Sequence, residues 1–305
     1  MSKKIKNKIS NILTKANNKW GSPKGTFIVL GITLASLILI SLCIYIAIDS
    51  YNNEMERQYQ LRLQQEEEER IAAEQQAKLE AELLPIRQYE CVYNLPRLNL
   101  DAKYLNLNIT YQYPEYPSGC EVIAMTNMLN YYNFGLYKST LVNNYLPYSW
   151  SDWVNYYSGD PSSEDPGGCI MSPGIKDMTD AFFKDNPSKF KAFNVSGKNF
   201  EDLFAYIERG HPVQIWSTID MTEPYNILSQ IGDYKWYENN HSVLITGFDK
   251  STGMVTVVDS INGEETYKIK TVNDIYEKQN YQAIVVVSED ELNSWLDGNL
   301  DASYM

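Results

Sequence analysis

The longest apolar stretch of the chain covers residues 26–48, TFIVLGITLASLILISLCIYIAI, 23 residues without a charge. As an α-helix this stretch would be about 34 Å long, enough to cross a hydrocarbon core of about 30 Å. A buried core helix is the alternative, but such helices are seldom apolar on every face for about six turns. The pattern therefore predicts a transmembrane helix over residues 26–48.

The charges on either side of this stretch predict its orientation. Residues 1–25 contain seven lysines and no acidic residue, whereas Asp49, Glu54 and Glu56 follow the stretch. Because basic flanks stay in the cytoplasm, residues 1–25 are expected to be a cytoplasmic tail and the rest of the chain to face outward. A cleaved signal peptide is disfavoured, since its apolar core usually spans about 7–15 residues. We expect a single-pass protein of the cell membrane.

Residues 49–85 are predicted to form a charged helical stalk. The segment 52–84 contains no glycine or proline and consists mainly of strong helix formers. Pro85 is expected to end this helix. Its apolar positions are interrupted by the run QQEEEER. A coiled coil that dimerises the chain is therefore one alternative, and a solvated spacer helix is the other.

Residues 86–305 are predicted to form one α+β domain. Apolar residues at helical spacing, and a capping-box pattern at Ser288 and Glu291, predict helices. These helices cover residues 120–132, 200–209 and 288–295. Runs rich in Val and Ile predict strands over residues 212–218, 242–248, 254–259 and 282–287. A helix first and strands after it are typical of the α+β class.

Composition excludes several classes of function. The net charge is −13, from 26 basic and 39 acidic side chains. Such an acidic chain has no field to hold a phosphate backbone, so nucleic-acid binding is not expected. Four cysteines and two histidines are too few for a disulfide scaffold or a zinc module. Gly-rich phosphate loops and zinc-ligand spacings are absent from the sequence, and we expect no metal and no organic cofactor.

Cys120 is the candidate nucleophile. It follows the turn-rich segment YPEYPSG and opens the predicted helix CEVIAMTNMLNYY. A thiol at a helix N-terminus meets unpaired backbone N–H groups and the positive end of the helix dipole, and both favour the thiolate. We therefore expect the pKa of Cys120 to lie well below its ordinary value of about 8.5. An inert buried cysteine is the alternative.

His241 is the candidate base, and Asp259 is the carboxylate that would orient it. If Phe248 pairs with Met254 across a hairpin, Val243 lies opposite Asp259. His241 then shares a face of the sheet with Asp259, one step along the strand and within reach of its side chain.

The other candidates are weaker. Asp249 lies at the far end of the histidine strand, and Asn262 is a less favourable orienting residue than Asp259. His211 precedes a proline and is interpreted as a turn or strand-start residue. Cys169 has no helix start and no histidine block beside it. A disulfide between Cys91 and Cys169 and two free thiols both remain open.

Three blocks, YQYPEYPSGCEVIAMTNMLNYY, GHPVQIW and NNHSVLITGFDK, resemble in this order the signature blocks of the bacteriocin-processing-like cysteine peptidases. This papain-like family is related to the peptidases that cut double-glycine leader peptides. The resemblance implies a catalytic helix packed on an antiparallel sheet. It also implies that Cys120 is the nucleophile, that His241 is the base and that Asp259 orients it. Gln112, eight residues before the cysteine, would help to form the oxyanion hole; a surface glutamine is the alternative.

Together these features predict a membrane-anchored, extracytoplasmic cysteine peptidase acting on a peptide or protein substrate. Leader peptidases of this kind are usually cytosolic and fused to an export transporter, so cleavage after double glycine is not transferred to this chain. A cell-wall peptide hydrolase or a transacylase with the same triad is one alternative. A catalytically inactive, tethered peptide-binding module is the other, and the intact set of four site residues argues against it.

The predicted orientation can be tested with protease added to intact cells that carry an N-terminally tagged chain. Residues 86–305 should be digested, and a small fragment containing residues 1–25 should survive on an immunoblot, because only the tail is cytoplasmic. Complete protection of the chain until the cells are lysed would contradict the outward orientation.

Overall fold

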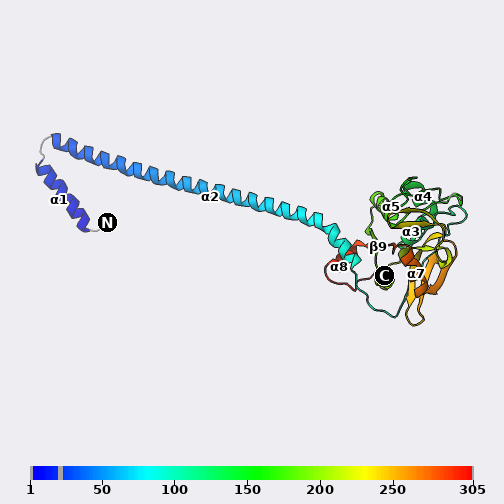
Figure 1. Ribbon diagram of the computed structural model, residues 1–305. Helices are drawn as coiled ribbons and strands as arrows, with labels where there is room; N and C mark the ends of the chain where they lie inside the picture. The colour runs from blue at the N-terminus through cyan, green and yellow to red at the C-terminus, as the bar shows by residue number, and fades with distance from the viewer. Residues whose placement is uncertain (1–2, 20–22, 166, 304–305) are drawn as a thin grey trace. The chain divides into compact units, whose positions relative to one another are not determined.

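The computed structural model describes residues 3–19, 23–165 and 167–303. The chain divides into two compact units, Met1–Ala81 and Glu82–Met305, and each is described by itself. The first unit contains helix α1 (Lys3–Lys19) and most of helix α2 (Pro23–Tyr93) (Figure 1). Among the described residues one helix, Phe27–Tyr93, is long and apolar enough to cross a membrane, and none of its most apolar window is buried. A signal sequence near an N-terminus passes the same test of length and composition.

Helix α2 continues through Pro85 to Tyr93, so the expectation that Pro85 ends the helix is wrong. A proline inside a helix lacks the N–H that would bond the carbonyl four residues back. The last helical turns belong to the second unit, and their contacts within that unit offset this loss. Val92 is fully buried, and its carbonyl accepts a hydrogen bond from Tyr206 Oη at 2.8 Å. Gln88 is also buried and accepts a hydrogen bond from Lys191 Nζ.

The second unit combines helices with a mostly antiparallel set of strands. Its helices are α3 (Cys120–Tyr131), α4 (Lys138–Asn144), α5 (Ser172–Asp185), α6 (Phe204–Glu208), α7 (Ile269–Lys278) and α8 (Glu289–Leu296), with 3₁₀ turns η1 (Phe200–Leu203) and η2 (Ile219–Met221). The helix expected over residues 200–209 is thus divided between η1 and α6. The strands are β1 (Ala102–Tyr104), β2 (Phe190–Asn194), β3 (Val213–Thr218), β4 (Ile227–Ile231), β5 (Tyr234–Tyr237), β6 (Asn240–Asp249), β7 (Met254–Asp259), β8 (Gly263–Lys268) and β9 (Ala283–Ser288).

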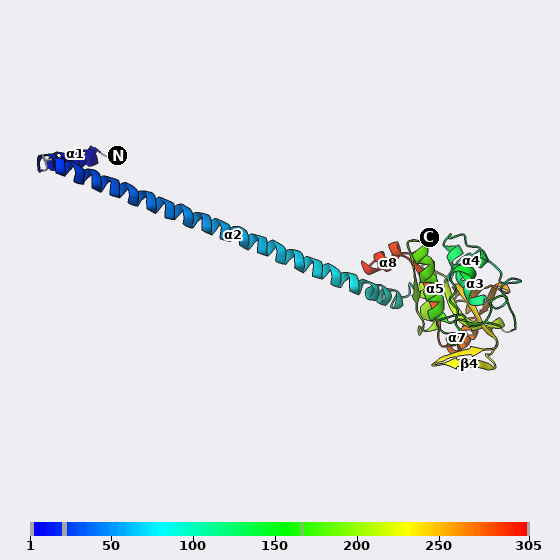
Figure 2. The same ribbon diagram turned by 90° about the horizontal axis from the view of Figure 1, so that it is seen from above.

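The main sheet has the order β2-β9-β3-β6-β7-β8, and every neighbouring pair in it is antiparallel. Strand β1 pairs with the end of β6, beyond the part that pairs with β3. Helix α3 packs against β3 and β6 and contacts α4 and α5 (Figures 1 and 2). Strands β4 and β5 form a separate hairpin at the edge of the domain (Figure 2). The α+β class expected from the sequence is confirmed.

The core lies between α3 and the central strands. Helix α3 is buried from Cys120 to Leu129, and β3 and β9 are buried at every residue. Strands covered on both faces read as continuous apolar runs rather than as alternating patterns. Ser288 accepts a hydrogen bond from the Glu291 backbone N–H and caps α8 as expected, while its hydroxyl, rather than its backbone N–H, donates to the Glu291 side chain.

The pairing of β6 with β7 contains one irregularity that bears on the site. Asp249, not Phe248, pairs with Met254, so the pairing expected at the turn is wrong by one residue. A bulge between Ile245 and Gly247 shifts the register back, and Ile245 then pairs with Val257. Because the extra residue is absorbed there, the half of the hairpin nearer the site keeps the register that was expected.

Glu208 fixes the segment between α2 and β1 to the domain. Its fully buried carboxylate contacts Arg97 Nη2 at 2.9 Å and accepts hydrogen bonds from the backbone N–H groups of Leu98 and Leu100. Each of these donors would lose its charged partner if Glu208 were truncated.

We expect Glu208→Ala to lower the free energy of unfolding by about 3–5 kcal/mol, because it removes the buried carboxylate partner of a largely buried guanidinium and of two N–H groups. Denaturant unfolding of the full chain in detergent, followed by tryptophan fluorescence, measures the change. The control is Lys189→Ala, which removes the exposed pair of Lys189 with Asp290 and should cost less than about 1 kcal/mol. Equal effects of the two substitutions would contradict this role of Glu208.

Candidate active site

The turn before α3 places Cys120 at the first position of that helix. Gly119 is the N-cap residue, and its N–H donates to the Tyr116 carbonyl at 2.9 Å. A Cβ added at position 119 would lie 2.9 Å from Tyr116 Cβ, closer than real Cβ contacts allow. This close approach therefore requires a glycine directly before Cys120.

A distant loop braces the same turn. The fully buried Tyr157 donates from its hydroxyl to the Ser118 carbonyl at 2.6 Å. The Ser118 N–H donates to the Pro161 carbonyl at 3.1 Å, and its hydroxyl donates to the Ser163 carbonyl at 2.6 Å. These three hydrogen bonds hold the backbone just before Cys120 in one conformation.

The Cys120 thiol is in a buried, acidic environment. Its side chain is only 7% exposed, and Sγ lies 3.3 Å from Glu121 Oε2. Burial and then the Glu121 carboxylate raise the pKa of Cys120 well above its ordinary value, while the Ser242 N–H acts in the opposite direction. The expectation of a lowered thiol pKa is therefore wrong: desolvation outweighs the favourable end of the helix dipole.

His241 and Asp259 are brought together by neighbouring strands β6 and β7. His241 Nε2 lies 2.9 Å from Asp259 Oδ1, and both side chains are buried. The geometry of an aligned hydrogen bond is not met, so this is a close contact between the imidazole and the carboxylate. Burial by itself would raise the pKa of Asp259. The contact with His241 and the N–H groups of Ile261 and Asn262 nevertheless bring it below its usual range.

Gln112 is buried and not a surface residue. Its Nε2 donates to the Pro117 carbonyl at 2.6 Å, and its Oε1 accepts from the Ser260 hydroxyl at 2.6 Å. The Gln112 backbone N–H also donates to the Ser260 carbonyl at 2.9 Å. Because Ser260 follows Asp259, these bonds connect the segment before the nucleophile to the end of β7. One amide hydrogen of Gln112 has no partner among the described residues.

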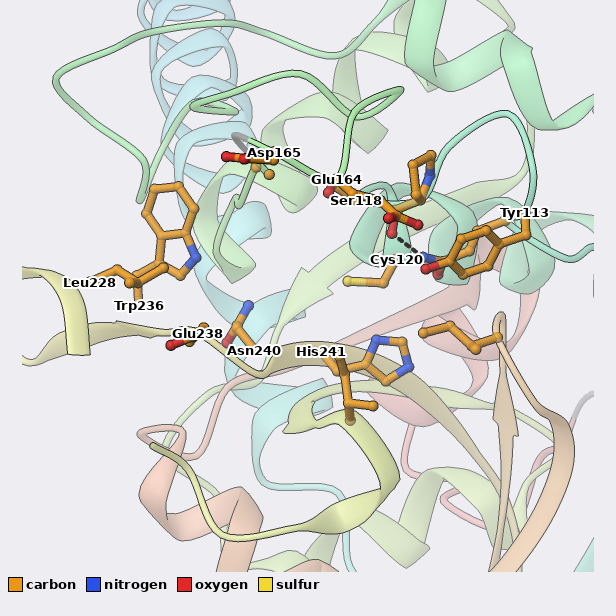
Figure 3. A pocket seen from close by; sticks show the side chains of 16 residues that line it. Tyr113, Ser118, Cys120, Glu164, Asp165, Leu228, Trp236, Glu238, Asn240 and His241 are labelled. Carbon is orange, nitrogen blue, oxygen red and sulfur yellow. Dashed lines mark hydrogen bonds between the residues drawn. The ribbon is translucent and has the colours of Figure 1, made fainter. Parts of the chain in front are cut away.

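Cys120, His241 and Gln112 line one cavity of about 720 Å³. Cys120 projects into it from α3 and His241 from β6 (Figure 3). Asp259 is not one of the lining residues and supports His241 from behind. Elsewhere the wall combines apolar and acidic side chains, among them Leu228, Trp236, Ile261, Glu164, Asp165 and Glu238. None of the described lining residues is a lysine or an arginine.

The structure adds residues to the site that sequence reasoning missed. Glu121 is fully buried beside the nucleophile. Cys169 is also fully buried, and its Sγ accepts a contact from Asn240 Nδ2 at 3.8 Å, one residue before His241. The view that Cys169 lies away from the histidine block is therefore wrong. Only the position of Glu121 next to Cys120 in the chain could have signalled its role.

The remaining candidates lie outside the site. His211 Nδ1 is 2.9 Å from Tyr132 Oη, and its Nε2 is 3.0 Å from Glu291 Oε1, so this histidine joins α3 to α8. Cys91 and Cys169 are both free thiols. Within the described part of the chain, no group of three or more His, Cys, Asp or Glu side chains is arranged to hold a metal ion.

Comparison with known proteins identifies the family. Residues 100–285 match the profile of the Peptidase_C39 like family. The uncharacterized protein YvpB of Bacillus subtilis (strain 168) is 26% identical over 148 residues, 45% of this chain and 56% of YvpB. The chain therefore matches little more than half the length of that relative. A crystal structure described as a C39-like peptidase from Bacillus anthracis is similar with a TM-score of 0.55 and 20% identity, over 62% of this chain and 98% of that one.

Because the profile covers more than half of its residues, the chain belongs to the Peptidase_C39 like family. The family is one of cysteine peptidases, and the chain has the papain-like fold expected from the sequence. The likeness to the Bacillus anthracis structure supports the fold alone.

The hydrogen bond from Tyr157 to the Ser118 carbonyl can be tested by removing the hydroxyl. Tyr157→Phe should lower the free energy of unfolding by about 0.5–1.5 kcal/mol, because a part-buried carbonyl loses its hydrogen bond from a buried hydroxyl. Denaturant unfolding measures the loss. The control is Tyr156→Phe at the exposed neighbouring position, which should change stability by less than about 0.5 kcal/mol. If both variants match the parent chain, Tyr157 does not brace the turn.

Proposed function

We propose that this chain is a membrane-anchored, extracytoplasmic peptidase that cleaves peptide bonds with Cys120, His241 and Asp259. The observation that carries the proposal is the convergence of three groups on one cavity: a thiol at a helix start, an imidazole backed by a carboxylate, and the buried amide of Gln112. These are the parts that nucleophilic acyl transfer requires.

The raised pKa of Cys120 indicates how the first step proceeds. A thiol that stays protonated needs a base at the moment of attack, and His241 faces the same cavity. The sulfur attacks the peptide carbonyl while His241 takes its proton, and the same proton then passes to the departing amine. Water, activated by His241, hydrolyses the thioester.

Asp259 supports His241 throughout this cycle. Its carboxylate accepts hydrogen bonds from the backbone N–H groups of Ile261 and Asn262, which keep it ionised and in place. An ionised carboxylate beside the ring fixes the tautomer and stabilises the imidazolium that forms during attack.

The tetrahedral intermediate needs donors for its oxyanion. The N–H of Cys120 lies in the first turn of α3, where backbone N–H groups have no intrahelical acceptor. The second amide hydrogen of Gln112 is the other donor, and its partners Pro117 and Ser260 hold the amide in position. Two preorganised donors of this kind form an oxyanion hole.

The cavity walls favour a cationic peptide segment. Glu164, Asp165 and Glu238 line the cavity, and no lysine or arginine of the described chain forms an ion pair with them. Leu228 and Trp236, from the β4–β5 hairpin, add apolar contact surface beside these carboxylates. A lysine or arginine side chain fits both surfaces: its charge pairs with the carboxylates, and its aliphatic stem packs against the apolar side chains.

Membrane anchoring is supported by the sequence and by α2. Residues 26–48 carry no charge, and seven lysines precede them. The corresponding part of α2 is apolar and exposed over its whole described surface, as a lipid-facing helix would be.

The proposal predicts cleavage of a mixed peptide library by the full chain in detergent, with lysine or arginine enriched near the cut site. Mass spectrometry reads the products. Cys120→Ala should abolish cleavage, and His241→Ala should reduce kcat/KM by at least about 100-fold, because the base is lost. His211→Gln, a histidine outside the cavity, should leave kcat/KM within about twofold of the parent chain.

Other outcomes would redirect the assignment. Cleavage confined to cell-wall peptides would favour the hydrolase alternative, and transfer of the acyl group to an added amine would favour the transacylase. Cleavage that survives Cys120→Ala would contradict the proposed nucleophile. A chain that binds peptides and cleaves none would be a binding module.

A further inference from the structure

The carboxyl group of Glu121 lies directly beside the thiol of the proposed nucleophile. Glu121 is fully buried, and its Oε2 is 3.3 Å from Cys120 Sγ, close enough for the thiol to donate a hydrogen bond to it. This contact joins consecutive residues in the first turn of α3. The carboxyl is thus held within the helix that positions the sulfur.

The surroundings of Glu121 compensate its charge only weakly. Oε1 accepts from the Ile170 N–H and from Asn240 Nδ2, each at 3.4 Å, near the upper limit for a hydrogen bond. No lysine or arginine in the described chain forms an ion pair with it. Gln214 Nε2 donates to the Glu121 backbone carbonyl at 2.9 Å, which fixes its main chain without neutralising its side chain.

The titratable groups around Glu121 come from α3, from β6 and from two loop segments. Cys120 faces it from α3, His241 from β6, and Tyr157 and Cys169 from the two segments joined by the bridge before α5. Among these four groups only His241 can carry a positive charge. Burial raises the pKa of Glu121 to about 7, against the lowering effects of the Cys120 and Ile170 hydrogen bonds and of His241.

We propose that Glu121 is a positioning residue that shares one proton with Cys120 and thereby keeps the sulfur as a thiol in the resting site. In one form the Cys120 S–H donates to the Glu121 carboxylate. In the other, the S–H bond breaks, an O–H bond forms at Oε2, and the negative charge moves to the sulfur. The pair carries one negative charge in both forms, and no redox partner or second proton donor is required.

Two adjacent negative charges in a buried site repel each other strongly, so the pair resists losing its second proton. Full conversion of Cys120 to thiolate in the parent chain therefore requires alkaline pH. Removing the charge at position 121 removes this repulsion. The inference rests on the proposed role of Cys120, but it concerns the proton on the sulfur and not peptide cleavage.

A simpler structural role for Glu121 predicts something different. If the carboxyl only accepts hydrogen bonds from Ile170 and Asn240, an amide of the same shape would preserve both of them through its oxygen and would leave the thiol titration unchanged. The pH dependence of Cys120 reactivity separates the two roles, because a merely structural contact does not move it.

The test measures iodoacetamide alkylation of Cys120 across pH 5–11 in the full chain in detergent, with peptide mapping to separate Cys120 from the other cysteines. Glu121→Gln keeps the shape of the side chain and removes its charge. The control is Glu291→Gln, another buried glutamate, which contacts His211 outside the site. Unfolding curves establish that each variant is folded.

We expect the parent chain to show a minor rise in alkylation rate near pH 7 and its main rise at alkaline pH. Glu121→Gln should show a single rise, with its midpoint at least about one pH unit below the main rise of the parent. Glu291→Gln should follow the parent profile. An unchanged or higher midpoint in Glu121→Gln would overturn the proposal, and so would an equal shift in Glu291→Gln.

If Glu121→Gln does not fold, the parent profile decides alone: a single rise with no step near pH 7 overturns proton sharing. Alkylation does not depend on turnover. A chain that shows the expected shift but cleaves no peptide would retain proton sharing and refute the peptidase proposal. Peptide cleavage without the shift in the alkylation midpoint would support the peptidase proposal and refute proton sharing.

Discussion

Two hydrogen bonds between Gln112 and Ser260 hold the candidate site together. The backbone N–H of Gln112 donates to the Ser260 carbonyl, and the Ser260 hydroxyl donates to the Gln112 side chain. The first residue belongs to the approach to α3 and the second follows the last residue of β7. Because Asp259 is the neighbour of Ser260 and Cys120 starts the helix after Gln112, these bonds fix the distance between the nucleophile segment and the histidine hairpin. Tyr157 braces the same approach from a third segment.

The protonation of the nucleophile is decided by a competition between two local effects. The start of α3 favours a negative charge on Cys120, as any helix N-terminus does. Burial and the carboxyl of Glu121 disfavour it, and they prevail. In the proposed mechanism the sulfur therefore keeps its proton until His241 takes it during attack on a substrate.

The sequence was sufficient for those features that depend on local pattern. The apolar spacing of α3 and the Val- and Ile-rich strands predict the α+β class, and the hairpin register predicts that His241 lies near Asp259. Features that depend on tertiary contacts were missed. Helix α2 passes Pro85 because its last turns dock on the domain, and α5 was overlooked because Pro173 and Gly174 are unfavourable helix formers that occur here in its first turn.

The electrostatics of the site also depend on tertiary contacts. Glu121 follows Cys120 directly, yet its burial arises from Ile170 and Asn240, which are remote in the chain. A sequence pattern predicts where a helix begins, and therefore where its dipole favours a negative charge, but it does not predict how deeply a side chain is buried. The direction in which the pKa of Cys120 is shifted therefore follows only from the fold.

The bulge in β6 separates the hairpin into two halves with independent alignment. Beyond Gly247, pairing is set by the turn after Asp249, whereas before Ile245 it is set by β3, where Ser217 lies opposite His241. An error of one residue at the turn is thus not transmitted to the histidine. For protein engineering, this makes the turn at residues 250–253 a suitable place to graft a peptide or a label. The part of β6 that carries His241 keeps its register through its pairing with β3.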